Sequence, residues 1–218
     1  YRNELLREFG CWFFVLLSFW LALRWSEKPR WASALAVQAS VVLAALFRPE
    51  AVAMLPAFIM WQLFEAPAGE KLRRVLMIGG PAVAGLTAVL ALHLGGHLSE
   101  GRLAGEFARF STSRFDAKAE TMSQAFIDYA RGQSRTILFF GSLALVPVKF
   151  FSKIGILIAP LAFVLFSHQA RTTLSRFSLF AWGFVAHLLV LAAFTLDMQF
   201  LAGRYAGLLL LMAAPFVG

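Results

Sequence analysis

Long apolar stretches separated by short polar connections make up most of this chain. The apolar stretches cover residues 9–25, 31–47, 51–64, 75–95, 136–150, 154–167, 177–196 and 206–218. A membrane-spanning helix needs about 20 apolar residues, with a range of about 17 to 25. Stretches 9–25, 31–47, 75–95 and 177–196 meet this length, and residues 65–68 can extend 51–64. The pattern predicts an all-α transmembrane bundle with about six to eight membrane segments.

Charges in the connections predict an orientation for this bundle, because cytoplasmic connections carry an excess of Lys and Arg. The connection at 24–31 has three basic residues and one acidic residue, and that at 65–74 has three basic and two acidic residues. Both are therefore expected in the cytoplasm. The turn at 48–50 and the connection at 93–135, which has six basic and five acidic residues, are then expected on the outer side.

The next two apolar stretches leave two topologies open. If 136–150 and 154–167 both span the membrane, the basic segment 168–176 lies outside, against the charge rule. If 136–150 only lies in the membrane interface, 168–176 moves inside and 197–205 moves outside. Because 136–150 is short and contains Pro147, we favour the interfacial placement.

The long outer connection contains apolar residues at helical spacing. Two groups of three share the spacing i, i+4, i+7: Leu103, Phe107 and Phe110, and then Met122, Phe126 and Tyr129. They predict two short amphipathic helices on the membrane surface. A solvated loop that packs these residues against the bundle explains the pattern equally well. In either case 96–135 is expected to be an extracytoplasmic loop of one transmembrane domain, residues 1–218.

Composition supports a membrane location. Of the 218 residues, 60% are hydrophobic and 15% are charged, with a mean hydropathy of +0.71, whereas soluble domains are about half apolar and about a quarter charged. The net charge of +8 would suit nucleic-acid binding in a soluble protein. Here the basic residues lie between apolar runs, where they set topology, so no nucleic-acid partner is expected. The single cysteine, Cys11, excludes an internal disulfide.

Arg48-Pro49-Glu50 places two charges between strongly apolar stretches. One interpretation is a helix–helix turn, because Pro suits the first helical position, Glu favours a helix N-terminus and Arg extends to the interface. The other is that Arg48 faces an outer cavity and binds an anionic group such as a lipid-linked phosphate, since guanidinium groups make paired contacts with phosphate. Glu50 then has a supporting role.

Two further groups are candidates at the same outer surface. Arg2 and Glu4 lie just before the first apolar stretch, and Asp197, Arg204 and Tyr205 lie before the last. Plain helix-start and interface-anchor roles explain both groups, but their predicted side agrees with that of the 48–50 turn. The four His residues lack metal-ligand spacing, and no phosphate loop or nucleophile motif occurs. We therefore expect no metal and no cofactor.

Three quoted segments carry a resemblance to a known family: "RNELLREFGCWFFVLLSFWLALRW", "VVLAALFRPEAVAMLPAFIMWQLF" and "FLAGRYAGLLLLMAAP". In this order they resemble polytopic GT-C glycosyltransferases, in particular bacterial relatives of protein O-mannosyltransferases and of aminoarabinose lipid A transferases. The turn at 48–50, Pro56 and the pair at 204–205 stand where that family has comparable elements. Residues 206–207 are Ala-Gly, where many members have a proline soon afterwards.

The resemblance implies transfer of a hexose or pentose from a polyprenyl-phosphate donor to a lipid, glycan or protein acceptor, on the outer face of a bacterial inner membrane. It implies donor-phosphate binding by Arg48 and Arg204, with Tyr205 beside them. The family's catalytic Asp lies after an earlier helix, upstream of residue 1. Because the chain starts at Tyr1 and ends within an apolar run, we expect a piece of a longer protein that is inactive alone.

Two other classes remain open. A surface-polysaccharide polymerase or ligase would use outer-loop arginines such as Arg102, Arg109, Arg114 and Arg131. A transporter or flippase without chemistry would show paired half-helices and internal repeats, and no repeat is visible in the sequence. A purely structural membrane subunit is a further alternative.

Overall fold

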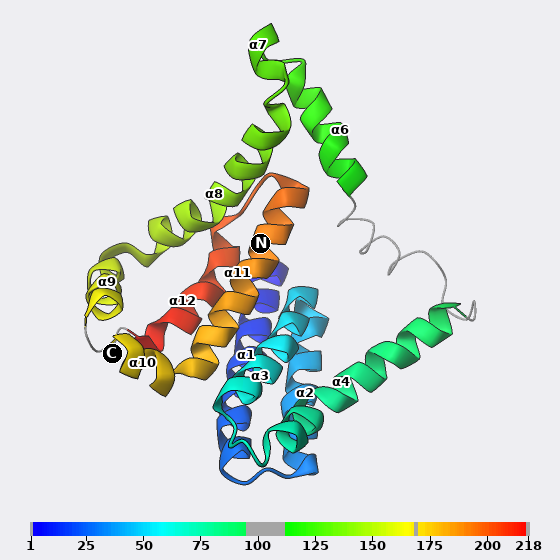
Figure 1. Cartoon of the computed structure of the whole chain (residues 1–218), viewed down its shortest axis with the longest axis vertical. Helices are drawn as coiled ribbons and strands as arrows, with labels where there is room; N and C mark the ends of the chain where they lie inside the picture. The colour runs from blue at the N-terminus through cyan, green and yellow to red at the C-terminus, as the bar shows by residue number, and fades with distance from the viewer. Residues whose placement is uncertain (1, 95–111, 168–169, 217–218) are drawn as a thin grey trace. The chain divides into compact units, whose positions relative to one another are not determined.

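A computed structural model describes residues 2–94, 112–167 and 170–216 (Figure 1). In these ranges the regular elements are helices and no strand occurs, which confirms the predicted all-α fold. Three helical segments are long and apolar enough to cross a membrane: Leu6–Glu27, Ser134–Ile154 and Ser178–Met198. The chain is therefore a membrane protein, and the total of six to eight membrane segments stays a prediction.

Helices α1 (Arg2–Glu27) and α2 (Trp31–Phe47) form an antiparallel hairpin and lie side by side in Figure 1. The indole of Trp25 donates a hydrogen bond to the Arg30 carbonyl and fastens the connection. The bounds of α2 agree with the sequence prediction. In contrast, α1 begins before the apolar stretch that starts at residue 9, because Arg, Glu and Leu are strong helix formers. Arg2 and Glu4 thus lie within the helix and not in a connection before it.

The predicted turn at 48–50 separates α2 from the 3-10 helix η1 (Pro49–Ala53), which leads into α3 (Met54–Glu65). Arg48 has an extended backbone, with φ −145° and ψ 113°, as a residue before proline should. Pro49 occupies the first helical position and Glu50 lies in the first turn. The local explanation of Pro49 and Glu50 as helix-start residues is confirmed.

The chain divides into two compact units, each described by itself. Unit 1 comprises 1–90, 159–187 and 211–218, and its core is aromatic: the ring of Phe19 packs against those of Phe58 and Phe180, with centroids 5.2 and 5.0 Å apart. Helix α4 (Lys71–Leu94), which has Pro81 inside it, is joined to α2 because the amide of Gln38 donates to the Ile78 carbonyl at 2.8 Å.

Unit 2 comprises 91–158 and 188–210. After the last residues of α4 its described helices are α6 (Thr112–Ser123), α7 (Asp128–Arg131) and α8 (Ser134–Ile154). The amphipathic helix predicted from Met122, Phe126 and Tyr129 is wrong. The chain turns after Ser123, so Met122 lies in α6 and Tyr129, 82% exposed, lies in α7. Helical spacing without a continuous helix caused the error. The first predicted group, Leu103, Phe107 and Phe110, lies outside the described residues.

Helix α8 is longer than its apolar stretch and α9 (Ile158–Phe166) is shorter, so α8 and not α9 has the length of a membrane span. Pro147 stays inside α8, whose 21 residues are about 31 Å long and match the hydrocarbon thickness of a membrane. The nine residues of α9 reach only about 14 Å. Gly155, at φ 55° in η2 (Gly155–Leu157), separates them. One crossing by this pair, whichever helix makes it, keeps the prediction that 168–176 lies on the inner side.

The last elements are α10 (Ala170–Arg176), α11 (Ser178–Met198), η3 (Gly203–Ala206), α12 (Gly207–Ala213) and η4 (Ala214–Phe216). Within unit 1, residues 175–180 line a common cavity with Ser26, Glu65 and Arg74. The basic segment before α11 and the two basic connections therefore lie at the same end of unit 1. This agrees with the topology that assigns all three to one side of the membrane.

Candidate functional site

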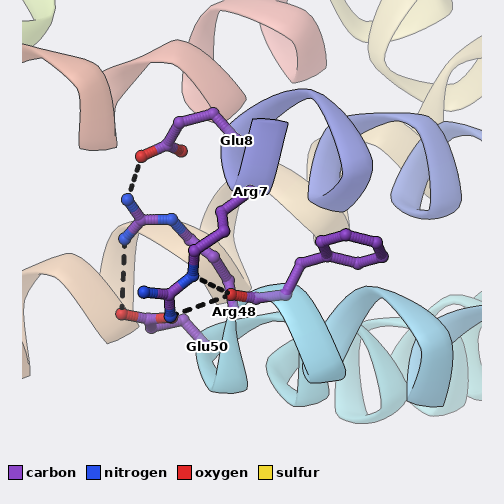
Figure 2. Close-up of polar contacts among 5 residues, drawn as sticks. Arg7, Glu8, Arg48 and Glu50 are labelled. Atoms are coloured by element: carbon purple, nitrogen blue, oxygen red, sulfur yellow. Dashed lines mark hydrogen bonds and ion pairs between the residues drawn. The ribbon is translucent and has the colours of Figure 1, made fainter. Parts of the chain in front are cut away.

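Arg48 lies between two carboxylates at the turn after α2 (Figure 2). Its Nη2 group donates a hydrogen bond to Glu8 Oε1 on α1, forming an ion pair. Its Nη1 atom is 3.9 Å from Glu50 Oε1 in η1, which is longer than a normal hydrogen bond. The guanidinium is thus held firmly by Glu8 and loosely by Glu50.

A second arginine reaches the same turn from α1. The Nε and Nη2 groups of Arg7 each donate to the Phe47 carbonyl at 3.3 Å. These bonds are at the long end of the normal range, and Arg7 is exposed. Because a guanidinium has five N–H donors, Arg7 keeps donors for an incoming group. Arg7, Glu8, Arg48 and Glu50 form a cluster that we call the turn cluster.

A close helix contact fixes the position of this turn. The ring of Phe47 stacks on Phe14 of α1, with centroids 5.9 Å apart and planes 23° apart. A Cβ atom at Gly10 would lie 2.6 Å from Phe47 Cε1, so only glycine permits this approach of the ring to α1. The hydroxyl of Ser40 also donates to the Phe14 carbonyl at 2.8 Å. The α1–α2 contact therefore fixes the position of the main chain at Arg48.

Three of the four side chains of the turn cluster are largely shielded from solvent, and the formal charges of the four cancel. The side chains of Arg48 and Glu8 are 18% and 8% exposed, and that of Glu50 is 26% exposed. Glu50 Oε2 is buried and has no hydrogen-bond partner among the described residues. Two arginines and two glutamates give a formal charge of zero. An anion that displaced the Glu50 carboxylate would meet the Arg48 guanidinium in a poorly hydrated place, where charged hydrogen bonds are strong, and the exposed Arg7 guanidinium from the solvent side.

The sequence pattern assigned Arg48 and Glu50 to the site but did not identify Arg7 and Glu8. The structure places no side chain of Arg2 or Glu4 within its description, so their supporting roles stay predictions. The α1–α2 hairpin is the signal that could have identified Glu8. Glu8 and Arg48 are each about 20 residues from the connection between α1 and α2, and residues at equal distances from such a connection face each other in an antiparallel helix pair.

The remaining candidates belong to unit 2. Arg204 lies over the Tyr205 ring, with its Cζ atom 5.5 Å from the centroid, and Tyr205 packs against Phe194 at 5.0 Å. This is the arrangement of a stacked aromatic anchor. Asp197, near the end of α11, forms an ion pair with Lys118 of α6, with Lys118 Nζ 3.7 Å from Asp197 Oδ1. The Lys118 ammonium also donates to the Asp197 carbonyl.

Comparison with known proteins adds no assignment to this geometry. Within the described ranges, no group of three or more His, Cys, Asp or Glu side chains is arranged to hold a metal ion. No protein-family model, no curated protein and no solved structure matches the chain.

Proposed function

We propose that this chain forms part of a membrane glycosyltransferase that moves a sugar from a polyprenyl-phosphate donor to a lipid, glycan or protein acceptor. The observation that carries the proposal is the convergence of Arg7 and Arg48 on one tight turn at the end of an apolar helix hairpin. The likeness of three sequence segments to GT-C transferases supports it. The site would face the outside of a bacterial inner membrane.

In this proposal the donor phosphate takes the place of the Glu50 carboxylate. Glu50 is the better exposed of the two acids and its ion pair with Arg48 is long, at 3.9 Å, so it is the easier one to displace. The phosphate oxygens would then accept hydrogen bonds from Arg48 Nη1 and from Arg7. Glu8 would remain on Nη2 and keep the Arg48 guanidinium in place.

The chemical role of this pair is to stabilise the leaving group. When the sugar–phosphate bond breaks, negative charge grows on the released polyprenyl phosphate. Guanidinium groups that are already oriented lower the energy of that charge without reorganisation. The isoprenoid tail would lie against the apolar helices of the hairpin. We assign no general base to this chain, because the resemblance places that carboxylate upstream of residue 1.

The test is sugar transfer from polyprenyl-phosphate donors by the protein in its native membrane. Arg48→Lys keeps the charge but loses the paired geometry, and we expect turnover to fall at least about tenfold, by analogy with lost transition-state hydrogen bonds. Arg30→Ala is the matched control, since Arg30 is exposed at the other end of α2. Equal turnover in both variants at equal expression would reduce Arg48 to a turn residue.

A further inference from the structure

A cavity of about 420 Å³ lies at the end of unit 1 that is remote from the turn cluster along α1. Its lining residues come from the ends of α1, α3 and α10 and from the starts of α4 and α11, helices that are labelled in Figure 1. Its wall combines basic, polar and aromatic side chains, among them Arg74, Arg176, Ser26, Gln62, Trp61 and Phe180. This volume falls within the range of about 300–1,000 Å³ of small-molecule sites.

Gln62 gives the first indication of a ligand. The residue is 2% exposed and lines the cavity, yet its Oε1 atom has no hydrogen-bond partner in the described part of the chain. Buried carbonyl oxygens in folded proteins are nearly always satisfied. A ligand that donates a hydrogen bond into the cavity, such as a hydroxyl group, would supply the partner that this oxygen lacks.

The arginines give the second indication. Arg74 Nε donates to Glu70 at 2.8 Å and its Nη1 donates to the Ser26 carbonyl at 3.1 Å, so its guanidinium is held in place on the wall. Arg176 is exposed at the end of α10. Glu65 also lines the cavity, so the lining side chains have a formal charge of one positive unit. Arg74 is paired with Glu70 outside the lining, and Arg176 is therefore the main source of positive charge on the wall. The wall therefore suits an anion that also bears a hydrogen-bond donor.

We propose that this cavity binds the headgroup of an anionic phospholipid that carries a hydroxyl, such as a phosphoglycerol headgroup. The phosphodiester lies between Arg74 and Arg176, and a headgroup hydroxyl donates to Gln62 Oε1. A lipid fits better than a soluble glycerol phosphate because the cavity lies at the ends of membrane helices, where headgroups are found. Apolar Leu23 and Trp61 on the same wall provide a surface for the acyl chains.

Lipid binding to the purified protein, measured by native mass spectrometry with phosphatidylglycerol and phosphatidylcholine, tests the site. We expect phosphatidylglycerol to bind more tightly, and Arg176→Gln to weaken it about tenfold, the effect of one charge-assisted hydrogen bond. Arg73→Gln is the control, since Arg73 is exposed on α4 and outside the cavity wall. Equal losses in the two variants would overturn the proposal in favour of general surface charge.

A second variant isolates the hydroxyl contact and does not disturb any ion pair. Phosphatidylmethanol has the same charge as phosphatidylglycerol but no headgroup hydroxyl. Wild-type protein should prefer phosphatidylglycerol, and Gln62→Leu should abolish that preference while binding of phosphatidylmethanol is unchanged. A preference that survives Gln62→Leu would overturn the assignment of Gln62. Displacement of the lipid by millimolar sn-glycerol 3-phosphate would overturn the lipid as the occupant and indicate a soluble ligand.

Discussion

The Glu8 carboxylate on α1 pairs with the Arg48 guanidinium, forty residues later, where the chain leaves α2. Both side chains are largely buried, and removal of Glu8 takes away the shorter of the two carboxylate contacts of the Arg48 guanidinium. We expect Glu8→Ala to cost about 2–3 kcal/mol and to lower the thermal midpoint in detergent by several degrees. Glu27→Ala, at the exposed end of the same helix, should leave the midpoint unchanged.

A double variant separates the ion pair from the individual side chains. If Glu8 and Arg48 stabilise the fold through each other, Glu8→Ala with Arg48→Ala should cost less than the sum of the two single changes. Additive losses would show that each residue acts through other contacts.

Gly10 controls the geometry of the turn from the opposite helix. Gly10→Ala would push the Phe47 ring away from α1, because the new Cβ atom would lie 2.6 Å from it. Overpacking of this kind costs about 1–3 kcal/mol, and sugar transfer should fall as the main chain at Arg48 moves. In Gly80→Ala the new Cβ meets no atom within 4 Å, so the stability and activity of this control should be normal. Activity and thermal midpoint measured on both variants check the prediction.

Replacement by leucine should change the stability of the protein differently at two buried glutamines. Gln38 donates to the Ile78 carbonyl at 2.8 Å, and hydrogen bonds between membrane helices contribute about 0.6–2 kcal/mol, so Gln38→Leu should destabilise the protein. Gln62 has an unsatisfied oxygen, so in lipid-free detergent Gln62→Leu should be neutral or stabilising. Thermal midpoints that fall equally in both variants would contradict this difference.

The Lys118–Asp197 pair ties α6 to the end of α11 within unit 2. Lys118→Ala should release α6 and speed hydrogen exchange in residues 112–123, because the pair is partly buried and involves two contacts. Arg131→Ala removes an exposed pair with Asp128, and exposed pairs contribute little. Exchange in 112–123 should be unchanged in that control, and a similar increase in both variants would assign no particular role to Lys118.

Labelling of introduced cysteines with an impermeant thiol reagent can show on which side of the membrane each connection lies. The native Cys11 is buried and should not react. Cysteines placed at Lys28 and at Thr172, both exposed, should react from the same side of the membrane. A cysteine at Arg204 should react from the other side. Labelling of 28 and 172 from opposite sides would contradict the single crossing by α8 and α9, and labelling of 172 and 204 from one side would contradict a crossing by α11.

Local sequence patterns predicted the elements around the turn well. Proline and its preceding residue have few backbone options, which is why the ends of α2 and η1 could be placed. The pattern failed for the length of α8, because Pro147 is accommodated within one continuous helix of 21 residues. It failed again at Phe126, where helical spacing continued past the actual end of α6.

The candidate site was only half predictable, because ion pairs depend on tertiary contacts. The position of Arg48 between apolar stretches identified it as a candidate, but the sequence did not indicate an ion-pair partner on another helix. Its partner Glu8 lies on another helix, and only the pairing of α1 with α2 brings them together. Glu8 therefore holds the Arg48 guanidinium in place, and an incoming phosphate would compete only with the longer Glu50 contact.

The central claim is that Arg48 binds the phosphate of a polyprenyl-phosphate donor, and direct binding tests it best. Polyprenyl phosphate and polyprenol differ only in that phosphate. We expect the wild-type protein to bind polyprenyl phosphate at least about tenfold more tightly, as one or two charge-assisted hydrogen bonds would produce. The Glu8→Gln, Arg48→Met double variant removes both charges of the Glu8–Arg48 ion pair together, and it should lose this discrimination while remaining folded. A folded double variant that still discriminates between the two ligands would contradict the claim.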